Sequence, residues 1–163
     1  MGNRREASPR RTRRLAAATA VVAGLAVAAV PGVAWAHAVF LSSGSVPANS
    51  DQKLTLNVPE EKGPNVHNTK VVVVVPAGFS VSGCDQKKEW TCAVSPASGN
   101  RTVVTYTRSG GTDADARFSF GVHTPAQAGD YPFNTNQSYS DNSTERWDGP
   151  PGSDTPAPVL KVT

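Results

Sequence analysis

From residue 37 onward the sequence predicts an all-β fold, an immunoglobulin-like β-sandwich of about eight to ten short strands. Short runs rich in valine, threonine and aromatic residues recur along this part of the chain, as they do in strands packed within a sheet. Clusters of glycine, proline, asparagine and aspartate separate these runs, mostly at intervals of about ten to twenty residues. No run of ten or more residues after residue 36 has helical periodicity, so no long helix is expected there.

The strands are expected in a definite order. Five consecutive valines, Val71–Val75, predict a strand that is buried on both faces or lies deep in the sandwich, and Pro76-Ala77-Gly78 then forms a turn. Phe118–Val122 alternates apolar and small residues and includes Gly121, which permits a bulge. The segment 149–158 is rich in proline and is predicted to be irregular. The other expected strands are Val39–Ser42, Leu54–Val58, Phe79–Ser82, Glu89–Val94, Thr102–Thr107, Pro132–Tyr139, Thr144–Trp147 and Val159–Val162.

Residues 1–36 have the order of a secretory signal peptide. A cluster of arginines precedes an apolar stretch over 15–30, and Ala34-Trp35-Ala36 is a typical cleavage site. The apolar stretch is short for a membrane span, although an uncleaved signal anchor is the alternative. The paired arginines leave both Sec and twin-arginine export open, and the loose match to a twin-arginine motif favours Sec. We therefore expect a signal peptide over 1–36, one β-sandwich domain over 37–163, and a secreted or cell-surface protein.

The charge is divided unevenly between these two parts. The whole chain has a formal net charge of +3, but the first 36 residues contain six arginines and one glutamate, which leaves the rest near −2. The predicted mature domain therefore has no basic excess, and nucleic-acid binding is not expected.

Both cysteines, Cys84 and Cys92, lie in the predicted mature domain. An even number of cysteines in an exported chain predicts a disulfide. A copper-thiolate site is the alternative, but no histidine or methionine lies near either cysteine in the sequence.

Cleavage after Ala36 would make His37 the N-terminal residue. Its α-amine and ring Nδ1 could then close one chelate ring on a metal ion, and nitrogen and oxygen ligands of this kind suit Cu(II). The candidate partners are His67, His123, Glu60, Glu61 and the acidic residues near Trp147. For His67 and His123 a surface or hydrogen-bonded role is the simpler expectation.

The chain resembles the YcnI-like family of exported copper-binding domains over nearly all of residues 37–162. The matching segments are His37-Ala38-Val39, Val58-Pro59-Glu60-Glu61, Val75-Pro76-Ala77-Gly78, Gln137-Ser138-Tyr139-Ser140-Asp141, Arg146-Trp147-Asp148-Gly149-Pro150 and Pro156-Ala157-Pro158. The middle third departs from the family, because the loop from Cys84 to Cys92 around Trp90 replaces the usual glycine-rich hairpins.

This resemblance implies a mononuclear Cu(II) site of the single-histidine-brace kind. His37 would supply its amine and ring nitrogen, Glu61 a carboxylate, and Trp147 would lie against the metal. The alignment leaves Glu60 and Glu61 as alternatives for the carboxylate, separated by one residue.

The function expected from these features is non-catalytic binding of copper for storage, delivery or homeostasis. The expected partners are the copper ion and a membrane copper transporter or other copper-handling protein. One alternative is a periplasmic CopC-like carrier, because residues 37–43 resemble the opening of that family. The Asp-x-His ligand motif that occurs later in that family has no counterpart in this chain. A copper-dependent polysaccharide monooxygenase would need a second brace histidine, and an adhesive sandwich would need no metal. Hydrolase and nucleotide-binding motifs are not found.

Overall fold

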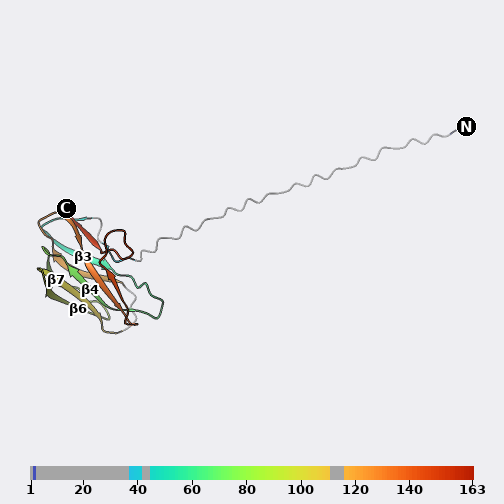
Figure 1. Cartoon of the computed structure of the whole chain (residues 1–163), viewed down its shortest axis with the longest axis horizontal. Helices are drawn as coiled ribbons and strands as arrows, with labels where there is room; N and C mark the ends of the chain where they lie inside the picture. The colour runs from blue at the N-terminus through green and yellow to red at the C-terminus, as the bar shows by residue number, and fades with distance from the viewer. Residues whose placement is uncertain (1, 3–36, 42–44, 111–115) are drawn as a thin grey trace. The chain divides into compact units, whose positions relative to one another are not determined.

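A computed structural model describes residues 2, 37–41, 45–110 and 116–163. The predicted signal peptide, apart from residue 2, lies outside the described residues. All the described strands belong to one compact unit, Trp35–Thr163 (Figure 1). They are β1 Val39–Phe40, β2 Ser45–Val46, β3 Asp51–Asn57, β4 Asn68–Val75, β5 Ser80–Cys84, β6 Trp90–Ala97, β7 Arg101–Arg108, β8 Arg117–His123, β9 Gly129–Pro132, β10 Asn134–Tyr139, β11 Thr144–Trp147 and β12 Val159–Val162.

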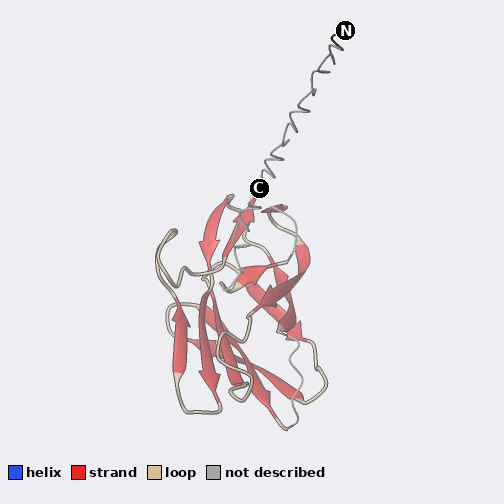
Figure 2. Cartoon of the chain, turned by 90° about the vertical axis from the view of Figure 1, so that its right-hand side faces the viewer, coloured by secondary structure: helices blue, strands red, loops and turns tan. Residues whose placement is uncertain are grey.

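The strands form two large sheets and one small one. One large sheet has the order β1-β3-β8-β5 and the other has the order β11-β10-β4-β7-β6, while β2, β12 and β9 form the third. Side chains from both large sheets enter a single hydrophobic core, as expected for a sandwich. Figure 2 shows strands and loops but no helix among the described residues. The all-β prediction is confirmed.

The valine run is the central strand β4 of the five-stranded sheet. Val71, Val73 and Val75 are fully buried in the core, whereas Val72 and Val74 are only half-buried. The strand has one inner and one outer face, so the second of the two predicted alternatives, a strand deep in the sandwich, is the one that the structure shows. Because the outer-face residues of this strand are also valines, the sequence alone cannot distinguish a strand with one buried face from a strand with two.

The predicted strand Pro132–Tyr139 is wrong in one respect, because it is two strands in different sheets. β9 pairs with β12, whereas β10 pairs with β4 and β11. Between them Phe133 is fully buried, and its backbone N–H donates to the carbonyl oxygen of Pro158 at 2.8 Å. Phe133 thus anchors the chain where it crosses between sheets. The two-residue strand β2 was also not expected, and with this division it brings the described strands to twelve.

The predicted disulfide is present between Cys84 of β5 and Cys92 of β6. These are the edge strands of the two large sheets, so the bond joins the sheets at one side of the sandwich. Because the cysteines are bonded to each other, the copper-thiolate alternative loses its ligands. The expected bulge falls on β5, between Val81 and Gly83, opposite Gly121. A Cβ at Gly121 would contact the Ser82 side chain, which explains the glycine there.

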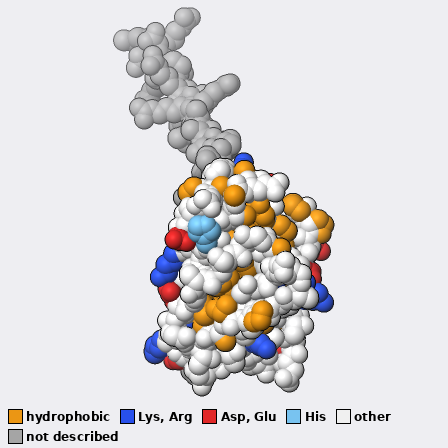
Figure 3. All heavy atoms as spheres, turned by 90° about the vertical axis from the view of Figure 1, so that its left-hand side faces the viewer, with side chains coloured by type: hydrophobic (Ala, Val, Ile, Leu, Met, Phe, Trp, Pro, Cys, Tyr) orange, Lys and Arg blue, Asp and Glu red, His pale blue; other side chains and the backbone are white. Residues whose placement is uncertain are grey.

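Two surface features bear on possible partners. On the face shown in Figure 3, the lysine and arginine side chains of the described residues are scattered and form no broad patch. Within the described part of the chain, no helix is both long and apolar enough to cross a membrane.

Candidate metal centre

His37 and Trp147 come together from opposite ends of the domain sequence. His37 is exposed and lies two residues before the start of β1, while Trp147 is the last residue of β11 and is 1% exposed. Their ring centroids are 6.0 Å apart, with the rings inclined at 66°. Since β1 and β11 are edge strands of the two large sheets, the contact lies where these edges approach each other.

Glu61 approaches the same place from the segment that follows β3. Burial raises the pKa of the Glu61 carboxyl, the negative charge of Glu145 raises it further, and the charge of His37 opposes this shift. Both groups therefore lie within electrostatic reach of Glu61. Of the three residues that the resemblance implies as a site, the structure thus places His37 against Trp147 and Glu61 within electrostatic reach of His37.

Glu60 has a different environment, although it is adjacent in the sequence. Its Oε1 accepts hydrogen bonds from the Asn68 backbone N–H at 2.7 Å and from Arg108 Nη2 at 3.1 Å. Its Oε2 lies 3.3 Å from Nδ1 of His67. The side chains of Glu60 and Arg108 are only 14% and 7% exposed. Glu60 is thus held in an internal ion-pair network, and this arrangement favours Glu61 as the carboxylate available to a metal ion.

Gln137 links Trp147 to the segment that carries Glu61. The Trp147 Nε1–H donates to Gln137 Oε1 at 2.9 Å, and Gln137 Nε2 donates to the carbonyl oxygen of Pro59 at 2.8 Å. Gln137 lies in one of the segments that match the family, but the sequence predicts no role for it. The only sequence feature that could have identified it is a polar residue at an inward position of an alternating strand, since Gln137 is fully buried.

Glu145 and Tyr139 complete the surroundings. Glu145 lies opposite Gln137 in the register of β10 and β11 and is half-buried. It is two residues before Trp147, so the two side chains share the inner face of β11. The pKa of Tyr139 is raised to about 12, mainly by burial. A hydrogen bond with the Glu61 backbone lowers this pKa, whereas the negative charges of Glu61, Glu145 and Glu60 raise it.

Among the acidic residues near Trp147, the structure thus places Glu145, and not Asp148, beside the candidate centre. Asp148 instead accepts hydrogen bonds from Arg146 at 2.9 and 3.1 Å.

The other two histidines have carboxylate partners elsewhere. His67 is paired with Glu60, and His123 Nδ1 lies 2.8 Å from Asp51 Oδ1 at the end of β8. His123 Nε2 is also 3.3 Å from Asn49 Oδ1. Each histidine is thus hydrogen-bonded, as the simpler expectation required. Across the described residues, no group of three or more His, Cys, Asp or Glu side chains is positioned to hold a metal ion by itself.

The donor chemistry of the centre fits Cu(II). An imidazole and carboxylates are nitrogen and oxygen donors, which suit this ion, and thiolate or thioether sulfur is not among them. Glu61 and Glu145 repel each other, and neither forms an ion pair with lysine or arginine within the described part of the chain. A divalent cation would relieve this repulsion. Cleavage before His37 would add its α-amine as a further nitrogen donor.

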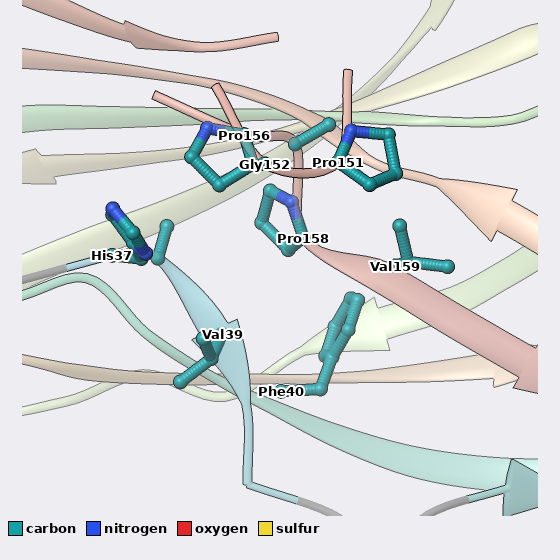
Figure 4. A pocket seen from close by; sticks show the side chains of 10 residues that line it. His37, Val39, Phe40, Pro151, Gly152, Pro156, Pro158 and Val159 are labelled. Atoms are coloured by element: carbon teal, nitrogen blue, oxygen red, sulfur yellow. The ribbon is translucent and has the colours of Figure 1, made fainter. Parts of the chain in front are cut away.

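His37 also lies at one end of a hollow of about 350 Å³. The start of the domain, from His37 to Phe40, forms one wall, and the proline-containing segment 151–159 forms the other (Figure 4). Two backbone hydrogen bonds between Gly149 and the Thr155–Ala157 stretch hold this segment in place, at 3.0 and 2.9 Å. The segment therefore has a defined conformation despite its irregular structure.

Residues 37–162 match the family described as a domain of unknown function, DUF1775. Among solved structures, the chain is similar to an uncharacterized protein from Nocardia farcinica with an immunoglobulin-like fold, at 21% identity and a TM-score of 0.63. That alignment covers 78% of this chain and 98% of the other. A second similar structure is the cohesin module of a family 33 glycoside hydrolase from Clostridium perfringens, at 8% identity and a TM-score of 0.56, covering 78% and 96% of the two chains. No curated protein matches the chain.

At these identities the structural similarities establish the fold alone, and they confirm the predicted immunoglobulin-like sandwich. The family match extends over most of the domain and begins at His37. DUF1775 is the family also known as YcnI-like, so the resemblance is confirmed at the level of the family, and the chain belongs to the DUF1775 family.

Proposed function

We propose that the mature protein binds one Cu(II) ion through His37, with Glu61 as a carboxylate ligand and Trp147 packed beside the metal. The observation that carries this proposal is the 6.0 Å contact between the rings of His37 and Trp147, with Glu61 in electrostatic reach of His37. These residues come from three distant segments, and their convergence at one rim of the sandwich supports a common role.

The proposal requires removal of residues 1–36. The α-amine of His37 would then bind the ion together with ring Nδ1, after losing a proton whose usual pKa is about 8. Export is consistent with the Cys84–Cys92 disulfide, because such bonds persist in oxidising compartments.

We propose a role in copper storage, delivery or homeostasis rather than catalysis. His67 and His123, the candidates for a second brace histidine, are each paired with a carboxylate away from His37. The hollow beside His37 is a surface on which a membrane copper transporter or another copper-handling protein could dock to exchange the ion.

The decisive experiment compares Cu(II) binding by two forms of the protein that both begin at His37, one with a free α-amine and one with that amine acetylated. The second keeps every side chain but converts the amine into an amide, so it cannot form the chelate. We expect its affinity to fall by more than about 100-fold, which exceeds the loss usually caused by residues that only support ligands. Competition titration with a chromogenic chelator measures the difference, and His123→Ala serves as a control that keeps the wild-type affinity. Equal affinities for the two forms would refute the proposed chelate.

A further inference from the structure

We propose that Gln137 is the positioning residue of the metal centre: its buried amide holds the Trp147 indole and the Pro59–Glu61 segment in a fixed relation. This inference rests on the copper-binding function proposed above. Gln137 reaches the metal ligands only through other residues, and its role would be to set their geometry.

The hydrogen bonds of Gln137 define the orientation of its amide. Its oxygen accepts from the indole N–H of Trp147, while its nitrogen donates to the carbonyl oxygen of Pro59 and, at 2.6 Å, to Oδ1 of Asn68. Both N–H groups and the oxygen are therefore used. Rotation of the amide by 180° would bring its NH₂ against the indole N–H and its oxygen against two acceptors. Only one orientation is compatible with these neighbours.

The network extends from Gln137 to the residues on both sides of Pro59, through the Val58 backbone and the Glu60 side chain. Asn68 Nδ2 donates to the Val58 carbonyl oxygen at 3.4 Å, and the Asn68 backbone N–H binds the Glu60 carboxylate. The three residues before Glu61, which are Val58, Pro59 and Glu60, are thus each held by a hydrogen bond to Gln137 or Asn68. Asn68 and Gln137 are 1% and 0% exposed, so water does not replace a lost partner.

This geometry couples two elements that share no strand pairing. Trp147 lies on β11, and Pro59 follows β3, which belongs to the other large sheet. The Gln137–Pro59 bond spans 78 residues and crosses between the two sheets. Loss of the amide would leave both sheets intact but would release the indole and the Glu61 segment from each other. The ligands would then no longer be held in register around the ion.

The test uses Gln137→Met, which has similar length and no hydrogen-bonding amide. We expect Cu(II) affinity to fall by about 10- to 100-fold, as for other residues that orient metal ligands, together with a changed Cu(II) electron paramagnetic resonance spectrum. Thr135→Val is the matched control. Thr135 is fully buried, lies two residues earlier in β10, and its hydroxyl donates to the Phe133 carbonyl oxygen at 3.0 Å. Its removal should lower stability but leave both the affinity and the spectrum as in the wild type.

A double-mutant cycle with Trp147→Phe identifies the route of the effect. If Gln137 acts partly through the indole N–H, Gln137→Met should cost less affinity in the Trp147→Phe background than in the wild type. Equal costs in the two backgrounds, or wild-type affinity and spectrum for folded Gln137→Met, would overturn the inference.

A measurement on the metal-free wild type remains decisive if Gln137→Met does not fold or if the wild type binds no copper. We expect slow hydrogen exchange at the Trp147 indole N–H, measured by nuclear magnetic resonance, because that proton is buried and bonded to Gln137. Rapid exchange would overturn the positioning role. Failure of the copper-binding proposal is recognised separately, by the absence of affinity in the wild type itself.

Discussion

At one edge of the sandwich, β5 and β6 are joined by the Cys84–Cys92 disulfide, whereas at the other edge His37, just before β1, meets Trp147 of β11 through a ring contact. The first edge is joined covalently. The second edge holds a histidine and two carboxylates, Glu61 and Glu145, that repel each other. Like charges placed together cost stability, and they are typical of sites where a ligand supplies the compensating charge. The disulfide edge thus stabilises the sandwich, and the other edge is the one at which we propose that the metal ion binds.

Removal of the disulfide tests the stabilising edge and should have a large effect on folding. Replacing both Cys84 and Cys92 by serine should lower the free energy of unfolding by about 2–3 kcal/mol, because the unfolded chain regains the entropy of a short loop. Denaturant unfolding measures this change. Cu(II) affinity should stay at the wild-type value, and a large loss of affinity in the folded variant would contradict the division between the two edges.

Trp147→Phe tests the binding edge from the side of the protein core. The variant removes the indole N–H and leaves Gln137 Oε1 buried without its donor, which should cost about 1–3 kcal/mol of stability beyond the loss of ring volume. Trp90→Phe is the matched control. Trp90 is also buried, at 3% exposed, but its Nε1 has no hydrogen-bond partner among the described residues. Denaturant unfolding should therefore show a larger loss for Trp147→Phe, and equal losses would argue against the indole bond.

The sequence predicted the parts of both edges that depend on local pattern. Alternation identified most strands, the cysteine pair predicted the disulfide, and the cleavage site drew attention to His37. The family resemblance supplied Glu61 and Trp147. These features can be read within about ten residues of each position, where periodicity and motifs carry information.

Long-range pairing explains what the sequence did not predict. The division at Phe133 depends on which sheet receives each half of the segment, and β2 exists only through its parallel pairing with β12. The choice between Glu60 and Glu61 depends on Arg108, which lies 48 residues after Glu60 and takes up its carboxylate. Gln137 shows no local sign of its three partners. The features that the sequence did not predict are thus those that depend on contacts between residues far apart in the chain.

Glu145→Gln tests whether the second carboxylate contributes to the binding edge. Removal of its negative charge should weaken Cu(II) binding about fivefold, which corresponds to about 1 kcal/mol for a charge acting at a distance in a partly solvated site. The effect should decrease at high salt, because screening weakens interactions between exposed charges. Competition titration at two ionic strengths measures both. Asp148→Asn is the control, since Asp148 is paired with Arg146, and an equal loss there would indicate a general effect of net charge.

The pH dependence of the metal-free protein gives the smallest expected effect and tests the raised pKa of Glu61. Burial and the charge of Glu145 raise the pKa of Glu61 above its usual value of 4.5, so the folded state binds this proton more tightly than the unfolded state. The contribution of Glu61 to stability is therefore most favourable below pH 4.5 and is lost as the pH rises through the folded-state pKa. Because Glu61 is exposed, the loss should be only a few tenths of a kcal/mol.

Denaturant unfolding of the metal-free protein between pH 4 and pH 8 should thus show a slightly smaller decline for Glu61→Gln than for the wild type. Asp154→Asn, which alters an exposed carboxylate in the segment 151–159, should follow the wild type. Cu(II) should reverse the trend in the wild type, because the ion binds the deprotonated ligands and competes with protons. If Glu61→Gln and the wild type decline in parallel, the pKa of Glu61 is not raised in the folded state, and the binding edge would lack the electrostatic cost that distinguishes it from the disulfide edge.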